Sequence, residues 1–400
     1  MSRITVIGID GGALSVEAGS LLEEAALVAG GGRHLEALGV EPGRAVVLKG
    51  ELSEALDRIG AAAGSVVVLA SGDPGFFGIV RLLAGRFGRE NLRVLPGVSS
   101  VALAFAHAGL AWDDAVTVSA HGRDPRLAVN VCRAHPKVAV LTSPEFGPAE
   151  LARELRGWER AFLVAERLGE PDERVLRGGA AEISARDWRD PNVVLVLDEA
   201  RETGKKGWVS GFLESRGRWA LPENAYVHRS GMITKAETRA LVLAHLAPGP
   251  GDLVWDVGAG SGSVAIECAR HGAAAVAIER DPESCDRIRE NAARHGACVR
   301  VVEGEAPEAL HALPEPDAVF VGGSGSKFEE IAKLCAVRAR RSVVLSLITL
   351  ERVVPAGEIL ASCGLEVETT FLQASRVKGV GDLHRLAAET PVFVVSGRKP

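Results

Sequence analysis

A strand pattern that runs straight into closely spaced glycines constrains the fold of this chain more than any other feature. Residues 253–257 read LVWDV, and Gly258, Gly260 and Gly262 follow immediately. Glycine allows the backbone to turn sharply and to approach a ligand without an intervening Cβ atom. The segment therefore predicts a buried strand, a tight ligand-binding loop and a helix in succession; a purely structural glycine turn is the alternative.

The spacing of these glycines and an acid further along the chain indicate the kind of ligand. A dinucleotide site of the form GxGxxG would have glycine at position 263, which is Ser263 here. The GxGxG spacing favours S-adenosylmethionine (SAM), which has no pyrophosphate to place at the helix N-terminus. Glu279 ends the next predicted strand, where its carboxylate can accept hydrogen bonds from both ribose hydroxyls. Ala259 and Ser261 belong to the same predicted site, and another nucleotide is the alternative ligand.

Two further loops of the second half refine this prediction. Glu305 and Ala306 follow the third strand of this half, where the Glu305 carboxylate can accept from the adenine amine; a solvated acid in a turn is the alternative. The fourth strand ends in Gly322, Gly323 and Ser324, not in the (Asn/Asp)-Pro-Pro-aromatic loop of enzymes that methylate amines. A target without an amino group, such as a ring carbon, is therefore favoured.

The rest of the chain alternates short β-branched runs with amphipathic segments, which is typical of α/β domains with largely parallel sheets. At 400 residues two domains are expected, and we place them at residues 1–200 and 231–400, with a linker over 201–230. The second domain should contain a seven-stranded sheet whose final strand is antiparallel. Its first helix should begin near Thr234, where Thr234–Glu237 has the form of a capping box. The predicted strands are Ile4–Ile9, Ala45–Leu48, Val66–Ala70, Leu92–Leu95, Val116–Ser119, Val138–Thr142, Ala161–Ala165, Val193–Leu197, Leu253–Val257, Ala275–Ile278, Val299–Val302, Ala318–Val321, Val343–Leu347, Glu366–Leu372 and Val392–Ser396.

Three polar clusters follow predicted strands of the first half. Ser71–Pro74 (SGDP) fixes a turn, and Pro96–Ser100 (PGVSS) joins a strand to a helix with serines suited to its N-cap. The third cluster contains His121 and Arg123, and a guanidinium is the preferred partner of a substrate carboxylate. Turn chemistry and an exposed loop are the alternative explanations for these clusters.

Composition excludes several classes of protein. The net charge of −6 disfavours nucleic-acid binding, which requires clustered lysine and arginine. No apolar run is long enough to span a membrane, and the chain begins with a strand pattern where a signal peptide would show a charged and then an apolar region. The six cysteines include no CxxC pair, which is typical of reduced thiols in the cytoplasm. We therefore expect a cytoplasmic protein that binds neither nucleic acid nor membrane.

Taken together, these motifs resemble the tetrapyrrole methylases of vitamin B12 synthesis, fused to a Rossmann-like class I SAM methyltransferase. The resemblance covers nearly all of the chain and rests on Ser71–Pro74, Pro96–Ser100 and His121–Arg123, and then on residues 232–235, Trp255–Ser263, 316–324 and Thr349–Glu351. It implies an N-terminal tetrapyrrole-methylase-type α/β module that methylates meso carbon 5 of a corrin precursor. It further implies that the C-terminal module methylates meso carbon 15 and removes carboxylate from the carbon-12 acetate.

The resemblance also implies one SAM site in each module. The residues that match the family's contacts in the second module are Thr234, Gly258 through Gly262, Glu279 and Ala306, and those in the first are Gly72, Asp73, Ser99, Ser100 and Thr142. The first strand departs from the family pattern, because its loop over Gly8–Ser15 is shortened, and Asp10 is therefore not counted as a contact.

The corrin precursor carries several acetate and propionate groups, and basic side chains are expected to bind them. We predict His121, Arg123 and Arg341 as substrate-binding residues, and late in the chain Arg338, Arg340, Arg376, Lys378 and Arg385 are further candidates. Glu351 or His384 is the hypothesised acid for decarboxylation. No metal is expected, and a homo-oligomer is implied by resemblance alone. The competing interpretations are an RNA methyltransferase and a SAM-binding regulator without catalytic activity.

Overall fold

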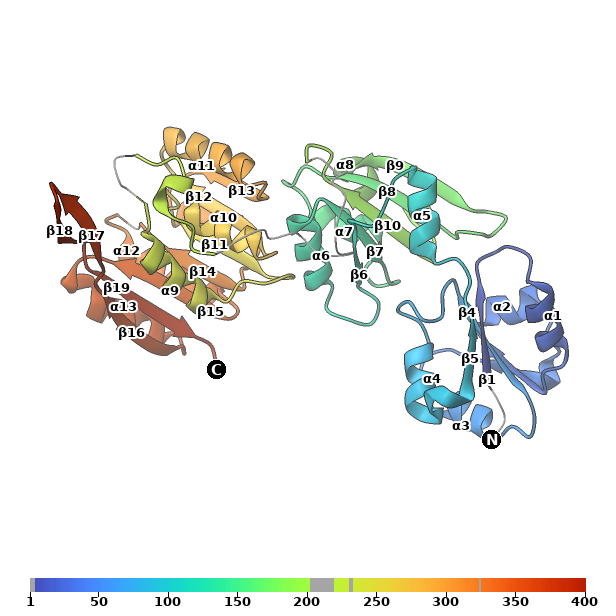
Figure 1. Ribbon diagram of the computed structural model, residues 1–400. Coiled ribbons are helices and arrows are strands. Elements are labelled where there is room, and N and C mark those ends of the chain that lie inside the picture. The colour runs from blue at the N-terminus through green and yellow to red at the C-terminus, as the bar shows by residue number, and fades with distance from the viewer. Residues whose placement is uncertain (1–3, 202–218, 230–232, 324) are drawn as a thin grey trace. The chain divides into compact units, whose positions relative to one another are not determined.

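The computed structural model describes residues 4–201, 219–229, 233–323 and 325–400 (Figure 1). These residues form two compact units, which are considered separately below. The first unit contains residues up to 123, 139–153 and 160–197, and the second contains 124–138, 154–159 and the chain from 198 onward. Within the described residues, no helix combines the length and the apolar character that crossing a membrane requires.

The first unit begins with a five-stranded parallel sheet of order β3-β2-β4-β1-β5. Four of its strands match predicted runs, whereas β2, with the sequence LVAG, is too short to produce a recognisable pattern. The bounds of the elements in this part are β1 Ile4–Ile9, α1 Val16–Glu23, β2 Leu27–Gly30, α2 Gly32–Ala37, β3 Ala45–Val47, α3 Ser53–Ala61, β4 Val66–Ser71, α4 Val80–Phe87 and β5 Leu92–Leu95. The carboxyl ends of β1, β4 and β5 meet at one edge, where the SGDP and PGVSS loops begin.

A second five-stranded sheet, of order β6-β7-β10-β8-β9, follows in the chain, and its β8–β9 and β8–β10 pairs are antiparallel. The strand β9 was not predicted, because its six residues are largely exposed and lack a β-branched run. The bounds are α5 Ser100–Ala108, β6 Val116–Ser119, α6 Pro125–Ala134, β7 Lys137–Leu141, α7 Pro148–Glu154, β8 Ala161–Glu166, β9 Arg174–Gly179, α8 Ala180–Ser184 and β10 Asn192–Leu197.

The second unit is built on the predicted seven-stranded sheet, of order β13-β12-β11-β14-β15-β19-β16. Strands β11 to β15 are parallel, and β19 is antiparallel to both β15 and β16, so the expectation of an antiparallel final strand is confirmed. The bounds are α9 Ala236–Leu246, β11 Leu253–Val257, α10 Ser263–Arg270, β12 Ala274–Glu279, α11 Pro282–Arg294, β13 Val299–Glu303, β14 Ala318–Val321, α12 Phe328–Arg338, β15 Ser342–Leu347, α13 Val353–Ser362, β16 Glu366–Leu372, β17 Ser375–Val380, β18 Leu383–Ala388 and β19 Val392–Arg398.

Both faces of this sheet are covered, which explains why β11 is buried at every residue. Trp255 and Val257 pack with α12 and α13, whereas Val254 packs with α9 and α10. Helices on both faces are typical of a parallel sheet, whose strands read as continuous apolar runs. The whole carboxyl edge of the sheet is therefore left as the place where loops can form a ligand site.

The predicted linker lies partly outside the described residues, because 202–218 and 230–232 are not placed. Its remainder is packed, since Tyr226 is buried and donates a hydrogen bond to Glu267 at 2.9 Å. The predicted capping box is wrong: α9 begins at Ala236, and its first amide donates to the Glu223 carboxylate at 3.1 Å. A carboxylate distant in the sequence thus replaces the Thr234 hydroxyl, which a local sequence pattern cannot reveal.

Candidate active sites

The second unit contains a hollow of about 240 Å³ at the carboxyl ends of its parallel strands. Gly258, Glu279, Glu305 and Ala306 line it together with Gly323, so four of the predicted SAM contacts converge there. Carboxyl ends of adjacent strands where the strand order reverses are the usual ligand position in open α/β sheets. Here the reversal lies between β11 and β14, next to Gly258.

The three glycines of the β11 loop have the backbone conformation that their sequence predicts. Gly258, Gly260 and Gly262 have φ values of 70°, 56° and 72°, in the left-handed region that side chains disfavour. A Cβ atom on Gly258 would also overlap the backbone of Gly323, the glycine that follows β14. The loops after β11 and β14 therefore touch backbone to backbone.

The side chain of Glu279 lies at this hollow and is held in place by backbone amides. One carboxylate oxygen accepts from the Gly260 amide at 2.9 Å, and the other accepts from the amides of Arg280 at 2.9 Å and Asp281 at 3.1 Å. Three of the four lone pairs of the carboxylate are thus used, and one on Oε2 remains to accept from a ribose hydroxyl. Glu279 thus joins the β11 loop to the end of β12 at the position where ribose is expected.

The remaining predicted contacts of this unit differ in position. Glu305 is exposed and lies 3.4 Å from Arg280, whereas Ala306 is half-buried at the same edge. Ala259 and Ser261 support the loop: the Ala259 carbonyl accepts from the Gly262 amide at 2.8 Å, and Ser261 is buried. Thr234 is half-buried and does not line the hollow; its carbonyl accepts from the Arg239 guanidinium at 2.6 Å.

Sequence analysis overlooked Asp256, which precedes this loop and is 1% exposed. Its Oδ2 accepts from the Ala265 amide of α10 at 2.9 Å, and its Oδ1 has no hydrogen-bond partner among the described residues. Burial raises the pKa of this carboxyl to about 7; the hydrogen bond from Ala265 opposes the shift and the nearby Glu279 carboxylate adds to it. An acid within an otherwise apolar strand was the signal that could have identified it.

The two hypothesised acids lie outside the hollow. Glu351 is exposed in the 3-10 turn Leu350–Arg352, and His384 is exposed on β18. The turn is nevertheless close to the hollow, because Arg352 donates to the carbonyl of Gly325, a lining residue, at 2.6 Å. Glu351 is therefore the better placed of the two.

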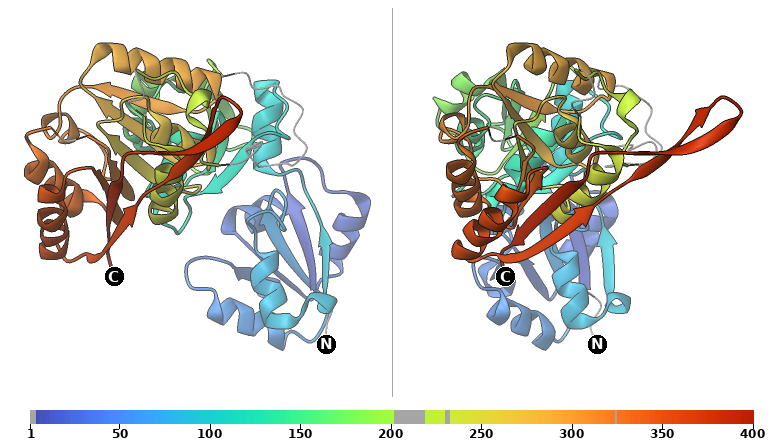
Figure 2. Two further views of the ribbon diagram at one scale, coloured as in Figure 1. Left: turned by 60° about the vertical axis from the view of Figure 1, so that its left-hand side comes forward. Right: turned by 90° about the vertical axis from the view of Figure 1, so that its left-hand side faces the viewer.

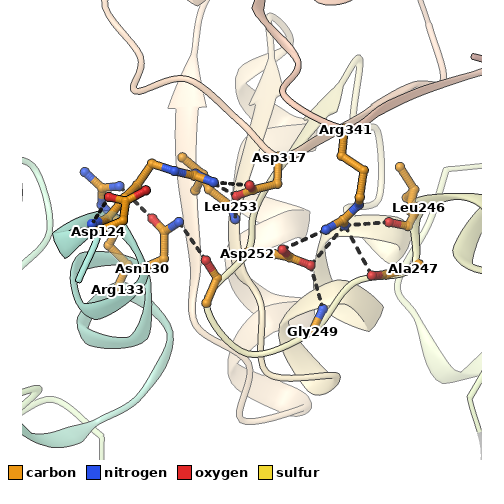
Figure 3. Close-up of polar contacts among 12 residues, drawn as sticks. Asp124, Asn130, Arg133, Leu246, Ala247, Gly249, Asp252, Leu253, Asp317 and Arg341 are labelled. Carbon is orange, nitrogen blue, oxygen red and sulfur yellow. Dashed lines mark hydrogen bonds and ion pairs between the residues drawn. The ribbon is translucent and has the colours of Figure 1, made fainter. Parts of the chain in front are cut away.

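Arg341 is engaged in a structural contact at the opposite edge of the sheet, just before β15 begins (Figure 3). Its guanidinium binds both carboxylate oxygens of Asp252, at 2.8 and 2.9 Å, and donates to the carbonyl of Leu246 at 2.8 Å. This network joins the end of α9 to the starts of β11 and β15. Arg341 therefore lies away from the hollow with its terminal nitrogens bound to Asp252 and Leu246, and its substrate role stays a prediction.

The first unit contains a larger cavity, of about 850 Å³. Among the predicted residues, Gly72, Ser100, His121, Arg123 and Thr142 line it. The clusters after β4, β5 and β6, which are distant in the sequence, thus meet around one space. Its volume is within the range that suits a ligand larger than a single amino acid.

Asp73 and Ser99 support this cavity but do not line it. Asp73 accepts from the Gly75 amide at 2.8 Å, and the Ser99 hydroxyl caps α5 by accepting from the Ala102 amide at 3.1 Å. Both residues thus stabilise the loops of the cavity, Ser99 as the predicted N-cap, and their contact with SAM stays a prediction.

The shortened first loop still reaches the cavity. Asp10 lines it and accepts from the amides of Gly12 at 3.1 Å and Val98 at 2.9 Å. A Cβ atom on Gly8 would overlap the backbone of Gly72 and Gly97. The ends of β1, β4 and β5 are thus packed backbone to backbone, and the short loop is part of that packing.

A polar network in this cavity was not predicted. The Ser71 hydroxyl lies 2.9 Å from Nε2 of His34 and accepts from Arg33 at 2.8 Å, and Arg33 forms an ion pair with Glu170 at 2.7 Å. Burial and the Arg33 charge lower the pKa of His34, and Glu170 opposes this. These residues come from α2, from the end of β4 and from the loop after β8, so no local pattern connects them.

Two cations of the cavity remain available. Arg81 and Arg123 line it, and the guanidinium of neither forms an ion pair with any described residue. Arg33 and Arg167, by contrast, are both paired with Glu170. The cavity therefore offers two arginine side chains that can bind carboxylates of a ligand.

Comparisons with known proteins agree with this architecture. Residues 3–184 match the tetrapyrrole (corrin/porphyrin) methylases, and residues 224–399 match the precorrin methyltransferase domain. Over 338 residues, covering 81% of this chain and 79% of the relative, the chain is 42% identical to a precorrin-6Y C(5,15)-methyltransferase (decarboxylating) from a Sinorhizobium species.

Two shorter relatives each match less than half of the chain. A probable cobalt-precorrin-6B C(15)-methyltransferase (decarboxylating) of Pyrobaculum calidifontis is 33% identical, over 44% of this chain and 94% of the relative. A cobalt-precorrin-7 C(5)-methyltransferase of Salmonella typhimurium is 36% identical, over 44% of this chain and 89% of the relative. The extent of the match to the Sinorhizobium protein shows that the chain belongs to the family of decarboxylating precorrin-6Y C(5,15)-methyltransferases.

Proposed function

We propose that this chain transfers two methyl groups from SAM to meso carbons 5 and 15 of precorrin-6B (precorrin-6Y), and removes carboxylate from the carbon-12 acetate, in cobalamin biosynthesis. The proposal rests on one observation: a chain of this family contains two hollows lined in part by glycines, one in each unit. A single methylation would require only one of them.

We assign carbon 5 to residues 1–200, and carbon 15 with the decarboxylation to residues 231–400. The separate relatives support this division, because one is named for the C(5) and one for the decarboxylating C(15) reaction, and each matches 44% of the chain. The division also agrees with the two family matches, because the first ends at residue 184 and the second begins at residue 224.

SAM fits the residues present at both hollows. In the second unit, Gly258 leaves no side chain between the β11 loop and the ligand, and Glu279 presents a carboxylate for the ribose hydroxyls. In the first unit, Gly72 and Ser100 line the cavity and Thr142 donates its hydroxyl proton to Asn192 at its rim. When bound, SAM supplies an electrophilic methyl group to a nucleophilic ring carbon.

The protein's own contribution is mainly orientation, because a conjugated corrin precursor has nucleophilic meso carbons without further activation. Arg123 and Arg81 bind the acidic side chains of the substrate in the first unit, and His121 lies beside them at the cavity. In the second unit, Gly322 and Gly323 present no side chain at the end of β14, where a planar carbon target can approach.

Decarboxylation requires a proton for the macrocycle, and we propose Glu351 as its donor. Glu351 lies in the turn that Arg352 fixes to Gly325 at the hollow. Replacing Glu351 with glutamine should slow loss of carbon dioxide more than methylation at carbon 15. A Glu351→Gln enzyme with full decarboxylation would exclude this residue and leave His384 as the candidate.

We further propose that the enzyme works in the cytoplasm as a homo-oligomer. The six cysteines, all of them in the described parts of the chain, form no disulfide, which agrees with a reducing compartment. Large apolar side chains on the β17–β18 hairpin, among them Leu383 and Leu386, are 74% and 70% exposed, and self-association would bury some of them.

The experiment that tests the function is mass spectrometry of precorrin-6B after incubation with the full chain and SAM. The product should have gained two methyl groups and lost one carbon dioxide. A Glu279→Ala enzyme should stop after one methylation, and an Arg123→Ala enzyme should be impaired at carbon 5. A product with neither methyl group added by the unaltered chain would refute the proposal.

A further inference from the structure

The β17–β18 hairpin extends from the carboxyl edge of the second unit's sheet, the edge that contains the SAM hollow. Strand β16 runs parallel to β15, because both are antiparallel to β19, and β16 ends at Leu372 next to Val392. The hairpin that follows therefore leaves the sheet at the ends of β11 to β15. Figure 2 shows it as a long arm beyond the sheet.

Ion pairs fix the base of this arm beside the start of α9. Arg376 on β17 binds the carboxylates of Glu223 at 2.7 Å and Glu237 at 2.8 Å. On the returning side, Glu389 lies 3.8 Å from Lys235. Lys235 and Glu237 flank the first residue of α9, so the arm is anchored beside the segment that contains Thr234.

Further from the sheet, the face of the hairpin that contains Arg376 carries two positive charges directly opposite one another. Lys378 is two residues beyond Arg376 and therefore shares its face of the hairpin. The register pairs Lys378 with Arg385 across the two strands. Both side chains are exposed, and neither forms an ion pair with any described residue. Like charges placed opposite in a sheet repel one another unless an anion lies between them.

Along the carboxyl edge, a short exposed apolar segment lies between the arm and the SAM hollow. Ile348 and Leu350, which follow β15, are 69% and 68% exposed. The turn that contains Leu350 is tied to the hollow by the hydrogen bond from Arg352 to Gly325. From β11 to β16, the carboxyl edge thus carries in turn a donor site, an apolar surface and a pair of cations.

We propose that Ile348 and Leu350 support the ring of the substrate, and that Lys378 and Arg385 bind carboxylates at its rim. The inference rests on the proposed function and deepens it by naming the residues that orient the macrocycle for the second unit. The occupant is a large ring compound bearing several carboxylates, for which this combination of apolar surface and unpaired cations is complementary.

The other late basic residues either form contacts of their own or lie elsewhere. Arg338 donates to the carbonyls of Leu310 and Leu313, at 2.8 and 2.6 Å. Arg341 is bound to Asp252, and Arg376 to the two glutamates at the base of the arm. Arg340 lies beside Arg341 before β15, at the opposite edge of the sheet. Lys378 and Arg385 therefore remain as the pair available at the carboxyl edge.

The test is a double variant, K378Q/R385Q, in which glutamine keeps much of the side-chain length and removes the charge. The KM for precorrin-6B in methylation at carbon 15 should rise roughly tenfold, since two exposed ion pairs are lost. The kcat and the affinity for SAM should not change. The KM of the unaltered enzyme should also rise with salt, and that of the variant should rise less.

The matched control is K333Q/R398Q, which removes the same charge from α12 and from the end of β19, where Arg398 pairs with Ser342 at the opposite edge of the sheet. This variant should behave like the unaltered enzyme. An unchanged KM in K378Q/R385Q, or an equal rise in the control, would overturn the inference. So would a lower molecular mass of the variant by light scattering, because Lys378 and Arg385 themselves would then join copies of the chain and would not be free for the substrate. If the unaltered chain methylates nothing, the proposed function itself fails, and that result is distinct from these.

Discussion

The buried carboxyl of Asp256 should make the stability of the second unit fall as the pH rises. Its pKa is raised from its usual 3.8 to about 7, mainly by burial. Between these two values the folded chain keeps the proton while the unfolded chain releases it. Unfolding therefore releases a proton, and the free energy of unfolding decreases with pH until about pH 7, above which it levels off.

The expected magnitude follows from this interval. One pKa unit corresponds to about 1.4 kcal/mol, so about two units between pH 5 and pH 7 amount to roughly 3 kcal/mol. Little is lost to solvent screening, because Asp256 is 1% exposed. An Asp256→Asn variant keeps an oxygen for the Ala265 amide and cannot titrate, so this contribution to the pH dependence should disappear.

Urea unfolding followed by hydrogen exchange of peptides from β11 and α10 would measure this unit alone. Between pH 5 and pH 8, the free energy of unfolding of the unaltered chain should fall by up to about 3 kcal/mol more than that of the Asp256→Asn variant. Asp286→Asn is the control, because the Asp286 side chain is 78% exposed on α11. Parallel pH profiles for Asp256→Asn and the unaltered chain would refute the reasoning.

Three further predictions concern the sites and the arm. Gly8→Ala should reduce the stability of the first unit and its SAM binding, because the added Cβ would overlap neighbouring backbone. The control is Gly19→Ala on α1, where an added Cβ would have no atom within 4 Å; differential scanning calorimetry should show it to be neutral or stabilising. Glu279→Ala should weaken SAM binding to the second unit by roughly tenfold or more in titration calorimetry, since a charged hydrogen-bond acceptor is lost; unchanged heats would contradict its assigned place. The pKa of Glu223 is lowered to about 2, mainly by Arg376 and further by backbone hydrogen bonds, so this stabilisation is present above about pH 4.5 and is lost as the pH falls toward 2. Arg376→Ala should reduce that acid-dependent loss of stability, and a loss of unchanged size in acid unfolding would be evidence against it.

Periodicity predicted most of the fold because buried parallel strands have a strong signal. All seven strands of the large sheet were anticipated, since runs such as Ala318–Val321 are apolar on both faces. The hairpin of β17 and β18 was missed, because its exposed strands mix charged and apolar residues without alternation. Short or solvated strands are formed by pairing with neighbours, and that information is not local.

Some residues of the candidate sites could likewise be predicted from the local sequence, and others could not. The three glycines and Glu279 could be placed from spacing alone, because each lies at the end of a buried strand with a strong local pattern. Arg341 could not, because an unpaired arginine and one bound to Asp252 look alike in a sequence. His34 and Ser71 meet only through tertiary structure, although each lies beside a predicted or observed strand.

The contact between Gly258 and Gly323 also limits how this enzyme can be re-engineered. The backbone of Gly323 fills the space that a side chain at position 258 would need, so a different backbone path after β14 would also change the wall of the SAM-binding loop. Changing the accepted atom from carbon to nitrogen therefore requires both loops to be rebuilt together. In this unit, SAM binding and the choice of the methylated atom therefore depend on the same backbone contact.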